Sequence, residues 1–124
     1  MRNMSFMLTK QQIYNKTKTV TRRLGWGFLK PGDIVMACEK CQGLKKGESI
    51  VHISPIRILN TGWIALDRVT PPEVAREGFP DMTTAEFVEM FCNKMGCGPH
   101  TLVNRIEFEY CNVADAITRN GKGE

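Results

Sequence analysis

Two β-rich stretches joined by a short link most limit the folds open to this chain. Residues 33–41 (DIVMACEKC) and 49–59 (SIVHISPIRIL) flank the segment QGLKKGE. Such runs, separated by a short segment with glycines, are typical of a β-hairpin, and two lysines give this one a basic tip. Pro55 has no N–H to donate to a ladder, which predicts a bulge or an edge position there.

A short helix is predicted after the hairpin, in the segment TPPEVAREG. Thr70 suits the N-cap, Pro71 the first helical position, and Glu73 the third position of a capping box. Gly78 can adopt the left-handed conformation that ends a helix. The sequence therefore places a well-delimited helix just before Gly78.

A longer helix is predicted next, in the segment that starts with TTAE. Thr83 and Glu86 form a second capping box, and Gly96 provides the stop. Its apolar face contains Phe87, Met90 and Phe91.

The remaining elements favour a mixed architecture. We expect a short strand in MSFML, a helix from Thr9 to about Lys16, an extended segment over 18–23, and a half-buried strand over 101–110 with Leu102, Ile106, Phe108 and Tyr110 on its apolar face. This order lacks regular βαβ alternation, so it indicates an α+β domain around a small barrel or curled sheet.

Composition fits one globular domain and excludes several classes. The chain has 124 residues, of which 42% are hydrophobic and 24% charged, which argues against disordered and fibrous proteins. No apolar run approaches the roughly eighteen residues of a membrane span, and the N-terminus does not resemble a signal peptide, so we expect a cytoplasmic protein without membrane partners. The net charge of +4 permits contact with nucleic acid without requiring it.

The segment KTKTVTRR, residues 16–23, contains four cations, three hydroxyls and no carboxylate. It is either a solvated basic strand that contacts phosphates, or a reactive centre in which a lysine activates a threonine. Strand alternation would place Thr19 and Thr21 on one face and Lys18 and Arg22 on the other. A tight bend would instead bring Lys18 beside Thr21.

Several motifs together resemble the ASCH domain. They are KTVTRR (18–23), KPGD (30–33), AREGF (75–79), a helix containing EF, and VNRIEFEY (103–110). The resemblance implies a small PUA-like β-barrel with flanking short helices, in a superfamily associated with RNA. It places an ASCH domain at 1–112 and a polar tail at 113–124. The chain is also similar to ASCH proteins carried by phages, which implies the host cytosol if the protein is phage-encoded.

The resemblance also implies a catalytic constellation. One ASCH branch hydrolyses the acetyl amide of N4-acetylcytidine with a lysine, a threonine and a glutamate. Its K-T-x-T stretch matches residues 18–21, so Lys18 and Thr21 inherit the roles of base and nucleophile. The glutamate matches Glu77, with Glu73 as the alternative.

The chemistry of these residue types is compatible with those roles. A threonine hydroxyl needs an adjacent base, and a lysine serves as one only if burial or neighbouring cations lower its pKa. A glutamate can orient the lysine or donate a proton. Glu77 also lies in the last turn of its predicted helix, where the helix dipole disfavours a carboxylate.

The basic segment also supplies candidate residues for binding a nucleotide or RNA. Guanidinium groups match phosphate geometry, and aromatic rings stack on bases. The candidates are Lys16, Thr19, Arg22, Arg23 and Trp26, of which Trp26 lies in a loop flanked by glycines. Trp63 is expected to be a core or rim residue instead.

The cysteines suggest a structural zinc site. Cys38 and Cys41 have the spacing of a zinc knuckle, and Cys92 and Cys97 could complete four thiolate ligands, or His100 could replace one of them. Cys111 lies outside both pairs. The alternative is that these residues are ordinary buried thiols.

Two main functions follow, and neither requires a cofactor. The first is recognition of RNA or a nucleotide in a basic cleft between residues 16–23 and Glu77. The second is hydrolysis of a modified nucleoside or of RNA by Lys18, Thr21 and Glu77. A third is a phage accessory protein that inhibits a host factor. The oligomeric state stays open.

Overall fold

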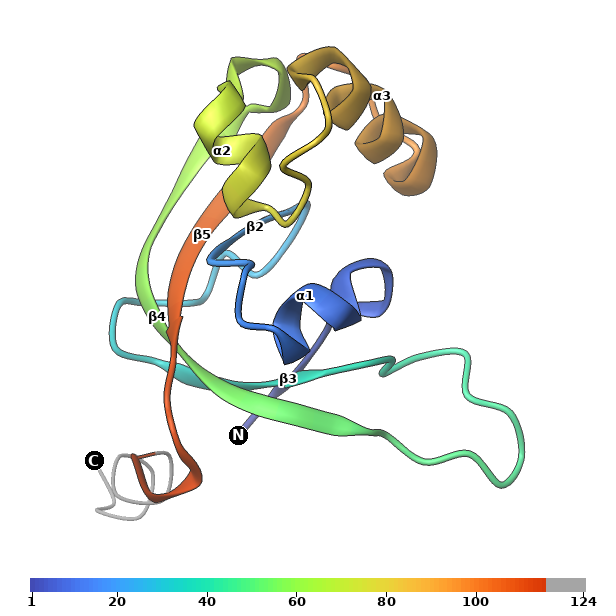
Figure 1. Cartoon of the computed structure of the whole chain (residues 1–124), viewed down its shortest axis with the longest axis vertical. Helices are drawn as coiled ribbons and strands as arrows, with labels where there is room; N and C mark the ends of the chain where they lie inside the picture. Colours follow the sequence, from blue (N-terminus) through green and yellow to red (C-terminus); the bar gives the residue numbers. More distant parts are fainter. Residues whose placement is uncertain (116–124) are drawn as a thin grey trace.

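A five-stranded sheet with short helices around it forms the described part of the chain, residues 1–115, in the computed structural model (Figure 1). The elements are β1 (Asn3–Ser5), the 3-10 helix η1 (Met7–Thr9), α1 (Lys10–Tyr14), β2 (Val20–Arg23), β3 (Ile34–Cys38), β4 (His52–Ala65), the 3-10 helix η2 (Leu66–Arg68), α2 (Pro71–Arg76), α3 (Thr84–Met95) and β5 (Leu102–Tyr110). The predicted α+β class is confirmed. Of the predicted tail, residues 116–124 lie outside the described part.

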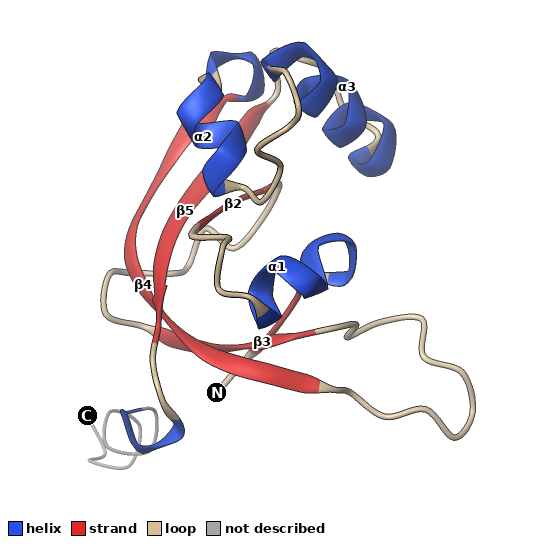
Figure 2. Cartoon of the chain, viewed as in Figure 1, coloured by secondary structure: helices blue, strands red, loops and turns tan. Residues whose placement is uncertain are grey.

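The strand order is β1-β3-β4-β5-β2 (Figure 2). The β1–β3 pair is parallel, and the other pairs are antiparallel. The sheet is open, with β1 and β2 at its edges, so the curled-sheet expectation is the correct one and a closed barrel is not formed. No helix among residues 1–115 has the length and apolar character needed to cross a membrane.

The predicted hairpin is confirmed as the antiparallel β3–β4 pair. Ile34 lies opposite Arg57, and the register shifts between Ala37 and Cys38, close to Pro55. However, β4 continues beyond residue 59 to Ala65, because its second half pairs with β5 across an irregularity between Ile58 and Asn60. The link that carries the two lysines extends away from the sheet in Figure 1.

The two helices after β4 begin and end as predicted, but only one has a capping box. Thr83 Oγ1 accepts from the Glu86 N–H at 3.1 Å, and Glu86 Oε1 accepts from the Thr83 N–H at 2.8 Å. Thr70 makes no side-chain cap bond at the start of α2, so that part of the prediction is wrong. The Glu73 carboxylate pairs with Arg22 and Arg105 of the sheet instead of completing the box.

Two hydrophobic clusters stabilise opposite ends of the long strands β4 and β5. The first contains Met4, Phe6, Ile13, Leu29, Val35, Ala37, Ile56, Ile58, Ile106 and Phe108. The second contains Leu66, Val69, Val74, Phe87, Phe91 and Val103. Because α2 and α3 supply the second cluster, Val103 is buried there and Leu102 is 62% exposed, against the prediction for β5.

Candidate functional site

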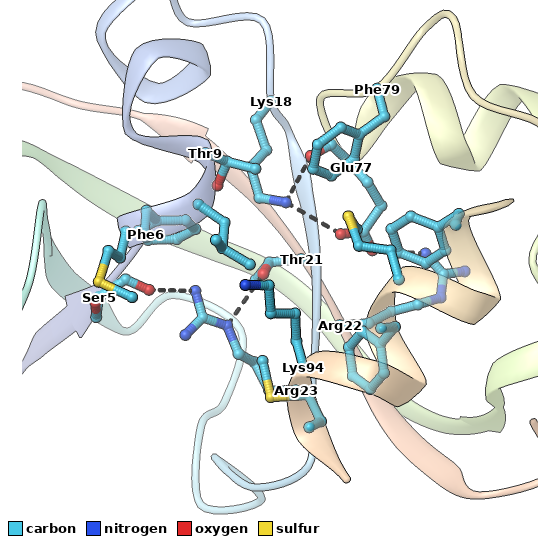
Figure 3. Close-up of a pocket in the computed structure, with 16 residues that line it drawn as sticks. Ser5, Phe6, Thr9, Lys18, Thr21, Arg22, Arg23, Glu77, Phe79 and Lys94 are labelled. Carbon is cyan, nitrogen blue, oxygen red and sulfur yellow. Dashed lines mark hydrogen bonds and ion pairs between the residues drawn. The ribbon is translucent and has the colours of Figure 1, made fainter. Parts of the chain in front are cut away.

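A cavity of about 340 Å³ lies between the segment β1–η1, strand β2 and helix α3 (Figure 3). Its apolar walls come from Phe6, Met7, Leu8, Phe79, Phe87, Met90, Phe91 and Met95. Its polar lining comes from Ser5, Thr9, Lys18, Thr21, Arg22, Arg23, Glu77 and Lys94. The three residues expected to be catalytic therefore line one space.

A bend before β2 brings Lys18 and Thr21 into this cavity. Lys16 has a φ of +61° just after α1, and the N–H groups of Thr17 and Lys18 both point to the Gln12 carbonyl. Regular strand structure starts only at Val20, so side-chain alternation does not yet apply at Lys18. The chain therefore bends before β2 and both side chains line the cavity, but among residues 1–115 Lys18 Nζ bonds to Glu77 and the Thr21 hydroxyl to Arg23 rather than to each other.

Lys18 is a buried lysine, with 3% of its surface exposed. Its Nζ donates to the Glu77 carbonyl at 2.6 Å and to Glu77 Oε1 at 3.0 Å. Burial lowers the pKa of Lys18, the Glu77 carboxylate opposes this shift, and Arg23 and Arg22 add to it. The neutral amine of Lys18 therefore forms more readily in this site than that of a lysine in water.

Glu77 balances two buried cations at once. It is 3% exposed, and its Oε2 accepts from Arg22 Nη1 at 2.9 Å while its other oxygen binds Lys18. Arg22 also donates through Nη2 to Glu73 at 3.0 Å, and its Nε is buried without a hydrogen-bond partner among the described residues. Two carboxylates thus bind both terminal nitrogens of the Arg22 guanidinium.

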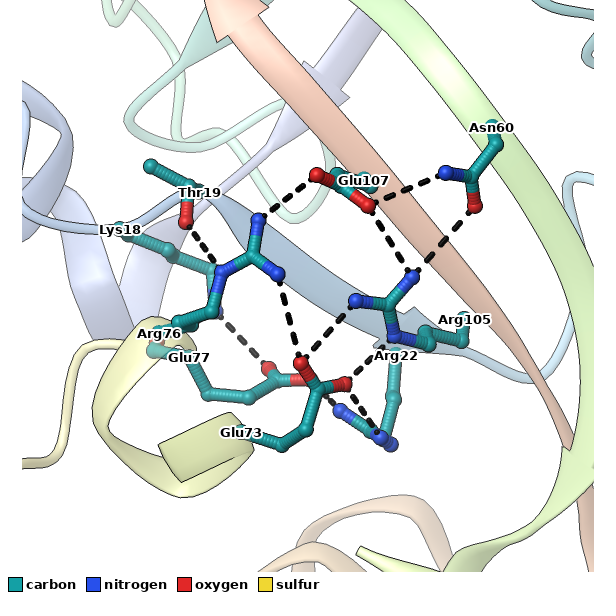
Figure 4. A network of polar contacts seen from close by, with 9 residues as sticks. All are labelled: Lys18, Thr19, Arg22, Asn60, Glu73, Arg76, Glu77, Arg105 and Glu107. Atoms are coloured by element: carbon teal, nitrogen blue, oxygen red, sulfur yellow. Dashed lines mark hydrogen bonds and ion pairs between the residues drawn. The ribbon is translucent and has the colours of Figure 1, made fainter. Parts of the chain in front are cut away.

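A wider ion network continues from Glu73 across the sheet (Figure 4). Arg105 pairs with Glu73 and Glu107, and Arg76 donates to Glu107 at 2.9 Å. Hydrogen bonds from Arg105, first of all, and from Arg22 lower the pKa of Glu73 to about 2 although its partial burial opposes this. The network contains the four cations Lys18, Arg22, Arg76 and Arg105 and the three carboxylates Glu73, Glu77 and Glu107.

Thr21 is 3% exposed, and its hydroxyl oxygen accepts a hydrogen bond from Arg23 Nε at 3.1 Å. Arg23 Nη2 donates to the Ser5 carbonyl at 2.7 Å, and the guanidinium lies 4.7 Å from the centre of the Phe6 ring. Burial lowers the pKa of Arg23 to about 10, with the Glu77 charge opposing the shift. Because Thr21 accepts from Arg23, its own hydroxyl proton stays available to a base or ligand.

Sequence reasoning missed Lys94, which reaches into the cavity from α3. Phe87, Phe91 and Lys94 follow one another at helical spacing of four and three residues, so they share a helix face. That spacing was the available signal, but Lys94 is an exposed residue of the helix, and such lysines are ordinarily solvated.

The other predicted binding residues lie outside this cavity. Lys16 is exposed, and the Thr19 hydroxyl accepts from Arg76 Nε at 3.0 Å. Trp26 packs against the first cluster and lines a neighbouring depression that shares Arg23 and Met95 with the cavity. Trp63 is 52% exposed on β4, where it covers Gly27 at the rim rather than joining the core.

The four cysteines proposed as zinc ligands remain two separate pairs. Cys38 and Cys41 contact each other at the end of β3, and Cys92 and Cys97 contact each other at the end of α3. All are free thiols, and residues 1–115 contain no group of three or more cysteine, histidine or acidic side chains placed to hold a metal. His100 pairs with Asp67 at 2.9 Å instead.

Comparisons with known proteins show similarity at the level of the fold. No family model and no curated protein matches the chain. The crystal structure of protein EF3133 from Enterococcus faecalis, described as family DUF984, is 17% identical, with a TM-score of 0.56 over 81% of this chain and 67% of that one. The crystal structure of the hypothetical protein PH0355 is 14% identical, with a TM-score of 0.57 over 89% of this chain and 96% of that one.

Proposed function

We propose that this chain is an ASCH-type protein whose cavity binds a nucleoside or nucleotide and hydrolyses an amide on its base, as in N4-acetylcytidine. The observation that carries the proposal is that Lys18, Thr21 and Glu77, each 3% exposed, line the same cavity. Its volume of about 340 Å³ falls in the range of small-molecule sites. That size suits one nucleoside better than a length of RNA.

The assignment to the ASCH type has two further supports. The K-T-x-T residues and the glutamate after a short helix come together, as the resemblance requires. In addition, the open five-stranded sheet with short helices is consistent with the PUA-like fold that the resemblance implies.

The proposed reaction uses Thr21 as nucleophile and Lys18 as base. The Thr21 hydroxyl attacks the amide carbon and its proton passes to the neutral Lys18 amine, while the Arg23 N–H steadies the threonine oxygen. The tetrahedral intermediate then expels the amine, whose nitrogen takes up from Lys18 the proton that came from Thr21. Water then attacks the acyl-threonine ester while Lys18 accepts its proton and passes it to the Thr21 oxygen, and the acyl group leaves as acetate. Glu77 positions Lys18 throughout.

A second candidate is an RNA-binding module without turnover. The depression beside the cavity is lined by Arg2, Arg23, Trp26 and Phe28, among others. Cations interleaved with aromatic rings are typical of single-strand binding surfaces. In this case the cavity takes one base of the strand.

Incubation of the full chain with N4-acetylcytidine and with single-stranded RNA tests both candidates. We expect Thr21→Ala and Lys18→Ala to lower turnover by about 100-fold or more. Thr17→Ala is the matched control, because this exposed threonine of the same segment does not line the cavity. RNA binding without turnover by the parent would support the module, and parent-like turnover by both cavity variants would refute the site assignment.

A further inference from the structure

Two cations of the cavity have no carboxylate partner in the described part of the chain. Arg23 donates to the Thr21 hydroxyl and the Ser5 carbonyl, which are both uncharged. Lys94 makes no ion pair within residues 1–115. By contrast, Lys18 and Arg22 are both paired with Glu77. The cavity therefore carries positive charge that its own carboxylate does not balance.

The two unbalanced cations enter the cavity from different elements. Arg23 comes from β2 and Lys94 from α3, and Figure 3 shows the Lys94 side chain extending toward the Thr21 and Arg23 side of the cavity. The Phe6 ring and the Ser5 carbonyl hold the Arg23 guanidinium in place, while its Nη1 has no hydrogen-bond partner among residues 1–115. Fixed, unused donors of this kind favour a ligand with several acceptor oxygens.

The surroundings of Arg23 make an anion especially favourable. No carboxylate of residues 1–115 forms an ion pair with its guanidinium, and burial, which disfavours the charged form, lowers its pKa to about 10. An anionic ligand would offset the cost of that burial. Arg22 is not available to an anionic ligand in this way, because Glu73 and Glu77 already bind its guanidinium.

We propose that Arg23 and Lys94 form a phosphate subsite, so that the ligand is a nucleoside monophosphate rather than a nucleoside. This inference rests on the proposed function. A guanidinium fork matches phosphate geometry, and a lysine adds a point charge. The sequence suggested Arg22 with Arg23 for this task, and the structure favours Lys94 in place of Arg22.

Calorimetric titration of the full chain with cytidine and with cytidine 5′-monophosphate tests the subsite. We expect the monophosphate to bind about tenfold or more tightly at low salt, from charge-assisted contacts. Lys94→Gln should remove most of that preference. Lys46→Gln removes one positive charge from the exposed hairpin link instead, and should preserve the preference for the monophosphate.

Three results would overturn the subsite: equal affinity of the parent for both ligands, equal loss of preference in both lysine variants, or tighter binding of an RNA strand without a terminal phosphate. Turnover of N4-acetylcytidine, measured in parallel, separates this inference from the proposed function. A preference for the monophosphate without turnover supports the subsite and rejects the hydrolase. Turnover without that preference supports the hydrolase and rejects the subsite.

Discussion

At the scale of single residues, Glu77 determines the electrostatics of the cavity. It follows the last residue of α2, where the helix dipole disfavours a carboxylate, and it is buried. Both disadvantages are offset because Lys18 and Arg22 bind its two oxygens at 3.0 and 2.9 Å. The unfavourable position that drew attention to Glu77 in the sequence thus has a physical explanation in the structure.

We expect Glu77→Gln to lower the free energy of unfolding by about 3–5 kcal/mol, because it leaves two buried cations without a full countercharge. Lys18→Met should cost less, since Glu77 keeps Arg22 and the methionine chain can occupy the lysine stem. Urea unfolding of both variants checks that Glu77→Gln loses more stability than Lys18→Met. Glu109→Gln, which removes a surface partner of Arg57, serves as the control and should cost about 0–1 kcal/mol. A Glu77→Gln effect as small as that of the control would contradict the role of Glu77.

At the scale of elements, α2 and α3 show how one sequence signature has two outcomes. Both begin with a threonine followed three residues later by a glutamate. Glu86 completes the cap of α3, whereas Glu73 turns to Arg22 and Arg105. Tertiary ion pairs therefore engage the Glu73 carboxylate in place of the local capping box.

The two threonines make a matched pair for mutation. We expect Thr83→Ala to lower the free energy of unfolding by about 1 kcal/mol, because Thr83 caps the Glu86 N–H. Thr70→Ala should stay within about 0.5 kcal/mol, since Thr70 makes no cap bond. Thermal or urea unfolding measures both, and equal losses would show that the observed difference in capping has no energetic meaning.

At the scale of the whole molecule, the ion network should make stability depend on acid. Arginine contacts depress the pKa of Glu73 to about 2, against 4.5 as its ordinary value. The carboxylate therefore contributes stability that is complete above about pH 5 and is lost as the pH falls toward 2. The shift corresponds to roughly 3 kcal/mol.

Urea unfolding at a series of pH values checks this expectation. The parent should lose stability between about pH 5 and pH 2, and Glu73→Gln should show a flatter dependence because it lacks this titrating group. Arg22, Arg76 and Arg105, which face Glu73, keep their charge over this interval. An identical slope in the variant would mean that other carboxylates control acid unfolding.

Local sequence signals predicted most elements and part of the site. The hairpin and the cap of α3 depend on nearby residues, so their patterns are readable in the chain, whereas the sequence left the bend at Lys18 as one of two alternatives. Lys94 was not predictable, because it reaches the cavity only after Phe87 and Phe91 pack α3 into the second cluster. The choice between a barrel and a curled sheet and the partners of Glu73 were not predictable for the same reason: each depends on contacts between distant segments.

The ion network also constrains how this chain can diverge. Each of its three carboxylates contacts at least two of its four cations, so the loss of one group changes the optimum residue at several others. A substitution acceptable in one background becomes harmful in another. The seven positions are therefore expected to be inherited as a block, with replacements at one fixed only after compensating replacements at its neighbours.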